Sequence, residues 1–481
     1  MYIFVTTISR DFCINRTKSI NILPMYDINT RTRIVSYLLY KSYTKSKYVK
    51  RWSSLLIIHV VKPGESLYTI SRLYNVSLDK IASDNELANP SRLVVGQTLV
   101  ILEGIRRHTV STGQSFYSIA ITYGLTVGEL AAANPQVSNP SLIYPGQILN
   151  IPPRTRKLGT IEVNGYAFPN ISMEVLRKTL PYLTYLSIFS HEVKEDGTLR
   201  EINDTPLIEA ARQAKVAPLL VITNLLPGGG FSSDLARTIL TSEQLQDTLL
   251  NNVAQILRAK NYYGLDIDFE YIYPENRENY NNFVRKAISK LRPLGYSVTT
   301  ALAPKLSAEQ RGLLYEAHDY PVHGQLASHV ILMTYEWGYT FGPPMAVAPL
   351  NAVRRILDYA VTAIPRDKIL MGIPNYGYDW TLPYQRGSRA VTLGNVGAVD
   401  LAARVGAQIK YDELSQAPYY NYYDESEKQH VVWFEDARSI EAKLRLAKEF
   451  RLSGVSYWTI GRYFPQNWLV LSSLHDVRKV I

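Results

Sequence analysis

Eight short apolar segments, separated by longer stretches of helical character, occupy residues 159–481. Alternation of strand and helix is typical of parallel β/α units. Eight such units predict an α/β fold closed into a (β/α)8 barrel, in which the carboxyl ends of the strands carry the active site. The predicted strands are 162–168, 183–189, 218–223, 264–270, 297–303, 329–335, 369–376 and 454–459.

The interval between the last two predicted strands is longer than one helix requires. Its central part, about 381–436, is rich in tyrosine, a residue that occurs 35 times in the chain. Tyrosine rings pack on pyranose faces while their hydroxyl groups bond to the sugar. The interval therefore predicts an inserted α+β subdomain that forms one wall of a cleft.

The fourth predicted strand carries Asp266, Asp268 and Glu270 at alternate positions. Because strand side chains alternate between two faces, the three carboxylates share one face. The other face is apolar and suits the surrounding helices, so we expect the acids to point into the barrel. Like charges this close raise the pKa of at least one member. Glu270 is outermost, where substrate arrives, and a carboxyl that holds its proton there predicts a general acid.

The same D-x-D-x-E pattern also fits a metal site or a buried structural network. A site for Ca²⁺ or Mg²⁺ needs several oxygen ligands, and the sequence contains no obvious further ligands. We therefore expect neither a metal ion nor a cofactor.

An internal repeat precedes the barrel. Residues 59–70 align with 108–119 at an offset of 49, which becomes 50 after one inserted residue. Each copy predicts a strand, two short helices and a second strand. In the first copy Ser66 is expected to cap the first helix. The predicted buried face of that helix is formed by Leu67, Ile70 and Leu73.

Both copies, 58–102 and 107–152, resemble LysM modules, from the Gly-(Glu/Gln)-Ser start to the Gly-Gln-x-Leu end. LysM modules bind N-acetylglucosamine-containing polymers such as peptidoglycan and chitin, in a shallow groove between helix and loop. The resemblance implies that the chain binds a cell-wall glycan through these modules and through the barrel cleft; a spacer role is the alternative. Two linked weak modules raise the effective concentration at the wall.

Residues 159–481 resemble the family 18 glycoside hydrolases, in which the D-x-D-x-E strand carries the catalytic acid. Met333-Thr334-Tyr335-Glu336 is similar to the M-x-Y-D motif of the sixth strand. Trp458 matches the tryptophan below the scissile sugar. The resemblance implies substrate-binding roles for Trp458, Met333, Glu336 and Tyr376.

The resemblance also implies a catalytic role for four residues. Glu270 is the general acid and base, Asp268 orients the substrate acetamide, and Asp266 shares a proton with Asp268. Tyr335 hydrogen-bonds the acetamide from the other side. No protein nucleophile is needed, because family 18 enzymes use the 2-acetamido group of the substrate. The sequence departs from the usual family pattern at three positions, Tyr263, Phe269 and Glu336.

Two N-terminal LysM repeats followed by this barrel are similar to bacterial spore cortex-lytic N-acetylglucosaminidases, and residues 430–439 fit that group. This implies a retaining glycosidase that hydrolyses β-1,4 bonds after N-acetylglucosamine in spore cortex peptidoglycan during germination, located in the spore cortex, coat or cell wall. The alternatives are a chitinase and a non-catalytic lectin-like wall binder. The retained Glu270 argues against the second alternative.

The net charge of +10 is mostly a property of the N-terminal segment. Residues 1–57 contain ten Lys or Arg and two Asp or Glu, which leaves only +2 for the remainder, so we expect no nucleic-acid partner. This segment is either a disordered basic arm or, as we prefer, not native protein, with translation starting near Leu56. No run of 18 apolar residues and no secretory signal pattern is present. Cys13 is the only cysteine, which excludes an internal disulfide, and we expect a monomer.

Overall fold

The computed structural model describes residues 56–102, 106–152 and 157–481, within one compact unit that begins at Ser54. Predictions for the basic N-terminal arm and Cys13 fall outside the described residues. The first strand, β1 (Leu56–Val60), already includes the last two residues of the predicted 1–57 segment. Among the described residues, no helix has the length and hydrophobicity required to span a bilayer.

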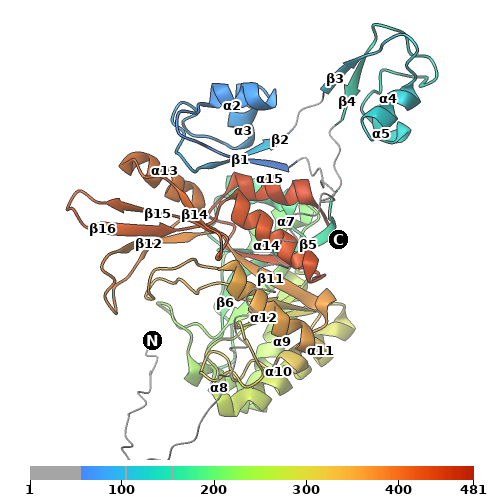
Figure 1. Cartoon of the computed structure of the whole chain (residues 1–481). Coiled ribbons are helices and arrows are strands. Elements are labelled where there is room, and N and C mark those ends of the chain that lie inside the picture. Colours follow the sequence, from blue (N-terminus) through green and yellow to red (C-terminus); the bar gives the residue numbers. More distant parts are fainter. Residues whose placement is uncertain (1–55, 103–105, 153–156) are drawn as a thin grey trace, which may run out of the picture. The chain divides into compact units, whose positions relative to one another are not determined.

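Eight parallel strands form the predicted closed barrel, which confirms the fold class (Figure 1). Neighbouring strands pair in chain order, and the last strand returns to the first, with Gly454 opposite Glu162. The strands are β5 (Gly159–Ala167), β6 (Tyr185–Glu192), β7 (Ala217–Thr223), β8 (Gly264–Asp268), β9 (Ser297–Leu302), β10 (His329–Leu332), β11 (Ile369–Pro374) and β17 (Gly454–Trp458). A further short strand, β18 (His475–Val477), pairs with the start of β5 and has no counterpart in the prediction.

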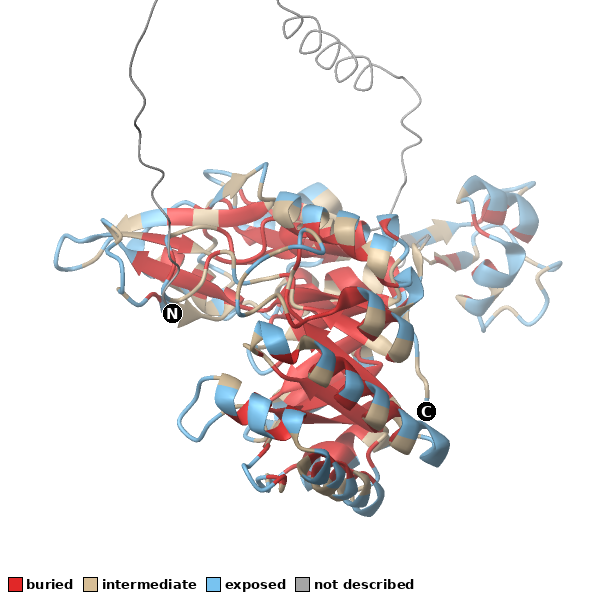
Figure 2. Cartoon of the chain, turned by 90° about the horizontal axis from the view of Figure 1, so that it is seen from below, coloured by how far each residue is buried: buried red, intermediate tan, exposed pale blue. Residues whose placement is uncertain are grey.

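Helices surround the barrel with their apolar sides inward and their polar sides in solvent (Figures 1 and 2). Every residue of β7 is buried, as expected for a strand between a packed interior and a helical layer. The barrel helices are α6 (Met173–Thr179), α7 (Thr205–Gln213), α8 (Ser233–Thr241), α9 (Glu243–Ala259), α10 (Arg277–Leu291), α11 (Tyr320–Leu326), α12 (Leu350–Ala363), α14 (Ala437–Glu449) and α15 (Pro465–Leu474). Short 3-10 turns lie at Leu180–Tyr182, Pro274–Asn276, Arg292–Leu294 and Arg366–Lys368.

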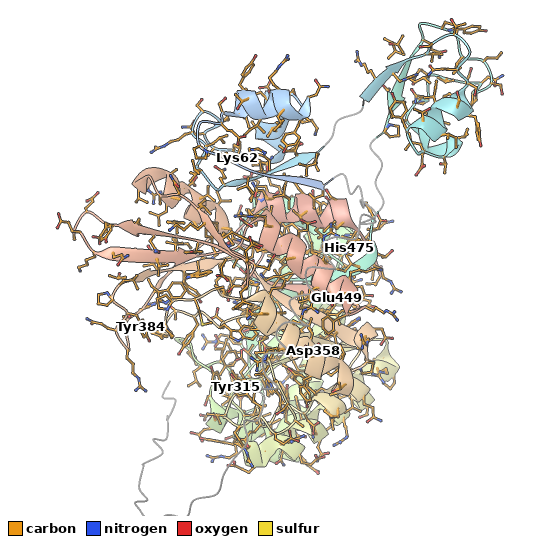
Figure 3. All side chains as sticks on the ribbon, in the orientation of Figure 1. Lys62, Tyr315, Asp358, Tyr384, Glu449 and His475 are labelled. Atoms are coloured by element: carbon orange, nitrogen blue, oxygen red, sulfur yellow. The ribbon has the colours of Figure 1, made fainter. Side chains whose placement is uncertain are left out.

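The inserted subdomain between β11 and α14 is a five-stranded antiparallel sheet with one helix, so the predicted α+β insertion is present. It begins at Gly377, ahead of the predicted start near 381. Tyr384, labelled in Figure 3, belongs to this insertion, and its hydroxyl donates to the carbonyl of Phe341 at 2.8 Å. The elements are β12 (Gly377–Thr381), β13 (Val391–Leu393), α13 (Asn395–Val405), β14 (Lys410–Asp412), β15 (Ala417–Tyr423) and β16 (Gln429–Trp433).

Each repeat is a strand–helix–helix–strand module, as predicted, with its two strands paired antiparallel. The elements of the first module are β1, α2 (Leu67–Tyr74), α3 (Leu78–Asp84) and β2 (Thr98–Leu102). Those of the second are β3 (Arg106–Thr109), α4 (Phe116–Thr122), α5 (Val127–Ala132) and β4 (Ile148–Ile151).

One detail of the predicted module core is wrong. Ser66 caps α2, and Leu67 and Ile70 are buried as expected, but Leu73 is exposed. Six residues of an α-helix turn through about 600°, which places Leu73 far from the face that Leu67 occupies. Ser71, four residues after Leu67, is buried on that face instead.

Phe269 provides a stability test of the outward face of the fourth strand. Its buried ring stacks on Phe283 and Tyr280 of α10, with ring centroids 5.8 and 6.2 Å apart. Phe269→Ala is expected to lower the free energy of unfolding by about 3–5 kcal/mol, because it leaves a cavity between strand and helix. Denaturant unfolding measures this. The control Phe341→Ala removes a half-exposed ring and should change stability by less than about 0.5 kcal/mol; equal losses would contradict the predicted orientation.

Candidate active site

The three carboxylates of the fourth strand region lie at the carboxyl end of β8. Asp266 and Asp268 are buried inside the barrel, while Glu270 lies two residues past the strand end and is half-buried. The intervening Phe269 packs outward on α10. Glu270 interacts electrostatically with Asp268. The structure therefore brings the three predicted acids to one site.

Asp266 has hydrogen-bond donors for only one of its oxygens among the described residues. Tyr166 and Ser187 donate to its Oδ2 at 2.7 and 3.1 Å, whereas its Oδ1 and the Oδ1 of Asp268 have no partner there. Burial raises the pKa of Asp266 to about 6, since two hydrogen bonds only partly offset the loss of water. Burial also raises the pKa of Asp268, and the charges of Glu270 and Asp266 raise it further. Asp266 and Asp268 therefore keep their protons to higher pH than free aspartic acid side chains do.

The pKa of Glu270 is shifted further from its ordinary value than the pKa of Asp266. Burial is the larger cause and the negative charge of Glu336 the second, and together they raise its pKa to about 8. A carboxyl with this pKa carries a proton at neutral pH and can still release it. Such a group is suited to general acid and then general base chemistry.

Glu336 lies in the segment that follows β10, where it contacts Tyr378 of the insertion. The hydroxyls of Tyr376 and Tyr378 donate to its carboxylate, the latter at 3.0 Å. These hydrogen bonds lower its pKa, but burial among protein atoms raises it more. The residue as a whole retains exposure and has a left-handed backbone, with φ +67°. A non-glycine residue held in this conformation is frequent at functional sites.

Tyr335 and Met333 lie at the same end of the barrel. Burial raises the pKa of Tyr335, and the negative charges of Asp268 and Glu270 raise it further. The Tyr335 hydroxyl therefore lies in the electrostatic field of these two acids. A side chain on Gly372 would meet the Tyr335 ring at 2.7 Å, so β11 requires glycine beside it. Met333 packs in the barrel interior with Trp458.

Trp458 ends β17 and remains half-buried. Its ring makes edge-to-face contacts with Phe189 and Tyr166, at centroid distances of 4.8 and 5.3 Å. Aromatic packing of this kind fixes the plane of a ring whose free face can accept a ligand. Tyr376, another predicted substrate-binding residue, is buried and reaches Glu336 through its hydroxyl.

Three residues absent from the prediction hold the backbone around Glu270. The side chain of buried Asn224 accepts from the Glu270 N–H at 2.9 Å and donates to the Glu270 carbonyl at 2.8 Å. His318 bonds the carbonyl of Phe269 at 3.0 Å, and Ser233 donates to the carbonyl of Tyr271. Asn224 directly follows β7, and a polar residue at a strand end of a barrel was the one available signal.

Metal binding was one alternative for the acidic strand. Within the residues that the structure describes, no three His, Cys, Asp or Glu side chains gather in a way that could hold an ion.

Comparison with protein families gives two matches. The model of Glycosyl hydrolases family 18 matches residues 171–462, and that of the LysM domain matches 59–102 and 108–152. The matches coincide with the barrel and with the two small modules.

Relatives extend the similarity over most of the chain. A cortical fragment-lytic enzyme of Bacillus subtilis (strain 168) is 44% identical over 432 residues, covering 88% of this chain and 99% of that protein. One of Bacillus cereus is 41% identical, with coverage of 88% and 100%. The crystal structure of the Bacillus megaterium QM B1551 spore cortex-lytic enzyme SleL is similar with a TM-score of 0.78 and 39% identity, covering 89% of this chain and 100% of that one.

The charge of Glu336 leads to a prediction about pH dependence. That charge raises the pKa of Glu270, so Glu336→Gln should lower the pKa of Glu270. If Glu270 must be protonated, activity on the alkaline side falls as pH passes its pKa, and the alkaline limb of a kcat/KM profile should move to lower pH. The exposed control Glu425→Gln should leave the limb in place. A limb that stays or moves upward in Glu336→Gln would contradict this coupling.

Proposed function

The chain belongs to glycosyl hydrolases family 18, and from this premise we propose that it hydrolyses β-1,4 bonds after N-acetylglucosamine in spore cortex peptidoglycan. It is a glycoside hydrolase that also carries two LysM domains. Similarity to cortical fragment-lytic enzymes over nearly the full length supports the cortex as substrate and spore germination as the setting. We further propose that it acts as a monomer in the spore cortex or coat.

The first chemical step transfers a proton from the Glu270 carboxyl to the glycosidic oxygen. At the same time the carbonyl oxygen of the substrate 2-acetamido group attacks the anomeric carbon, and the bond to the leaving sugar breaks. Asp268 orients the acetamide and balances the positive charge that develops on it. Asp266 takes part by sharing a proton with Asp268, and Tyr335 donates a hydrogen bond to the acetamide. The raised pKa of Glu270 supports its role as proton donor.

The second step reverses the roles. Glu270, now ionised, removes a proton from water, which attacks the anomeric carbon of the cyclic intermediate and restores the acetamide. Two displacements at one carbon retain the anomeric configuration. The Asn224 side chain keeps Glu270 in place through both steps, because it bonds the backbone on both sides of this residue.

Four further residues contact the substrate around the scissile bond: Trp458, Met333, Glu336 and Tyr376. Trp458 supplies an aromatic platform for the sugar, and its position beside Phe189 and Tyr166 supports this role. Glu336 accepts hydrogen bonds from sugar hydroxyl or amide groups, with Tyr376 holding its carboxylate.

One observation carries the proposed chemistry. Two buried acids lie behind a half-buried Glu270 whose pKa is near 8, with the Tyr335 hydroxyl in the same field. A lectin-like binder would have no use for a half-buried carboxyl that is protonated at neutral pH.

Substitution of the acid tests this mechanism. Glu270→Gln keeps the shape of the side chain but has no proton to donate, so kcat should fall by about 10²–10⁴ or more, while binding to insoluble wall is retained. Glu275→Gln alters an exposed residue five positions along and should retain activity. Steady-state hydrolysis of soluble cortex fragments measures both. Turnover by Glu270→Gln at the rate of the unaltered enzyme would exclude Glu270 as the acid.

Digestion products test the proposed substrate. Incubation with purified spore cortex should give fragments with N-acetylglucosamine at the reducing end, detected by mass spectrometry after reduction. Parallel incubation with chitin examines the alternative activity. Release of chitobiose from chitin with no products from cortex would assign the enzyme to chitin.

A further inference from the structure

The two LysM modules have the same internal framework. His59 in the first module and His108 in the second bond Tyr74 and Tyr123 at the same distance, 3.0 Å. The register of the strand pair is also shared, since His59 lies opposite Leu99 and His108 opposite Leu149. Differences between the modules therefore concern their surfaces and what covers them.

The outer face of the two-stranded sheet differs in polarity. Ile58 lies opposite Val100 in the first module, and both pack with the hydrophobic core of the barrel. The equivalent pair in the second module is Arg107 opposite Asn150. An apolar sheet face is buried at little cost, whereas burying the charged and exposed Arg107 would require a new partner for its guanidinium group. The first module alone has a sheet face suited to the barrel.

The loop before the last strand has the same shape in both modules. Ser91 N–H donates to Asn89 at 3.1 Å, and Ser141 N–H donates to Asn139 at 3.0 Å. In the first module, however, the inserted subdomain covers this loop. Arg92 donates to the carbonyl of Ala403 at 2.6 Å, and the N–H of Ile409 donates to the carbonyl of Val95 at 2.9 Å.

Gly96 shows how closely the inserted subdomain approaches the loop of the first module. A Cβ on Gly96 would lie 1.9 Å from the carbonyl oxygen of Ile409, while a Cβ on the equivalent Gly146 would meet nothing within 4 Å. Val94 is 6% exposed, and its counterpart Tyr144 is 65% exposed. The loop that is covered in the first module is open in the second.

Polar contacts with α15 complete the difference. Gln466 donates to the carbonyl of Thr98 at 2.6 Å and to the side chain of Asn85 at 3.1 Å. Thr98 is 3% exposed, and its counterpart Ile148 is 52% exposed. Glu86 pairs with Lys178 of α6 at 3.1 Å. Its position in the second module is occupied by Pro135, which cannot form an ion pair.

We propose that the two modules have different tasks: the first is built into the catalytic body through its sheet and loop, and the second binds the wall glycan through its open loop. The ligand is an acetamido-sugar chain, which rests on the proposed function. The open loop carries Leu142 and Tyr144, both large and exposed, and an exposed tyrosine ring packs on a pyranose face. Arg92 and Val94 occupy these positions in the first module, where Arg92 donates to Ala403 and Val94 is buried against the inserted subdomain.

Binding to insoluble spore peptidoglycan tests the assignment of the second module. In an enzyme made inactive by Glu270→Gln, Tyr144→Ala should weaken cosedimentation about tenfold. Tyr68→Ala removes an equally exposed tyrosine of the first module and should bind like its parent. Equal binding by Tyr144→Ala and its parent, or an equal loss in Tyr68→Ala, would overturn the inference. Hydrolysis of soluble fragments by the active enzyme is measured separately. If the active enzyme does not hydrolyse them, the proposed function is refuted. If it does, the binding result still decides the role of the second module.

Replacing two residues of the first module by their counterparts in the second tests whether the first module is attached to the barrel. Ile58→Arg with Val100→Asn introduces the residues that the second module carries at the same positions, so the module framework tolerates them. Hydrogen exchange of residues 465–474, in α15, should accelerate about tenfold or more as the module is released. The exposed control Lys62→Ser, labelled in Figure 3, introduces Ser111 of the second module and should leave exchange unchanged. Unchanged protection of α15 in the swap variant would overturn the attachment.

Discussion

The cost of removing carboxylates from water is the constraint on which the catalytic half depends. Asp266 and Asp268 lie inside a closed barrel, and among the described residues each leaves one oxygen without a hydrogen-bond partner. A structural acid pair would be expected to have full partners, because an unpaired buried charge is strongly destabilising. Raised pKa values are the consequence, and they keep protons available at the strand end where Glu270 meets solvent.

The backbone position of Glu270 is fixed by neighbouring elements and not by β8 itself. The strand ends at Asp268, so the acid would be on free backbone without further bonds. Asn224 bonds both backbone groups of Glu270, and His318 bonds the preceding carbonyl. Burial lowers the pKa of His318 to about 4, so this imidazole stays neutral beside the acids and adds no charge that would lower their pKa. Residues just after β7 and just before α11 thus hold the backbone of Glu270 beyond the end of β8.

Periodicity and resemblance predicted the barrel, the modules and the acidic strand, because each of these has a local pattern. The eight predicted strands correspond to β5–β11 and β17 with small differences at their ends. Local patterns could not identify Asn224, since its partner Glu270 lies 46 positions away and an asparagine has no periodic signature. Similarly, β18 has only three residues, and it pairs with the first residues of β5, which precede the pairing of β5 with β17. The roles of the site residues stay predictions that rest on chemistry and on family resemblance.

A repeat reveals a shared fold, but it does not reveal whether its copies share a task. The internal bonds of the two LysM modules are nearly identical, so sequence comparison of the copies emphasises what is common to both. The differences on which the assignment of tasks depends lie outside the module core, at positions such as Val100 and Asn150. One covered module enlarges the body that presents the cleft, and one open module supplies the contact that raises local substrate concentration. The modules differ in this way both at the outer face of the sheet and in the loop before the last strand.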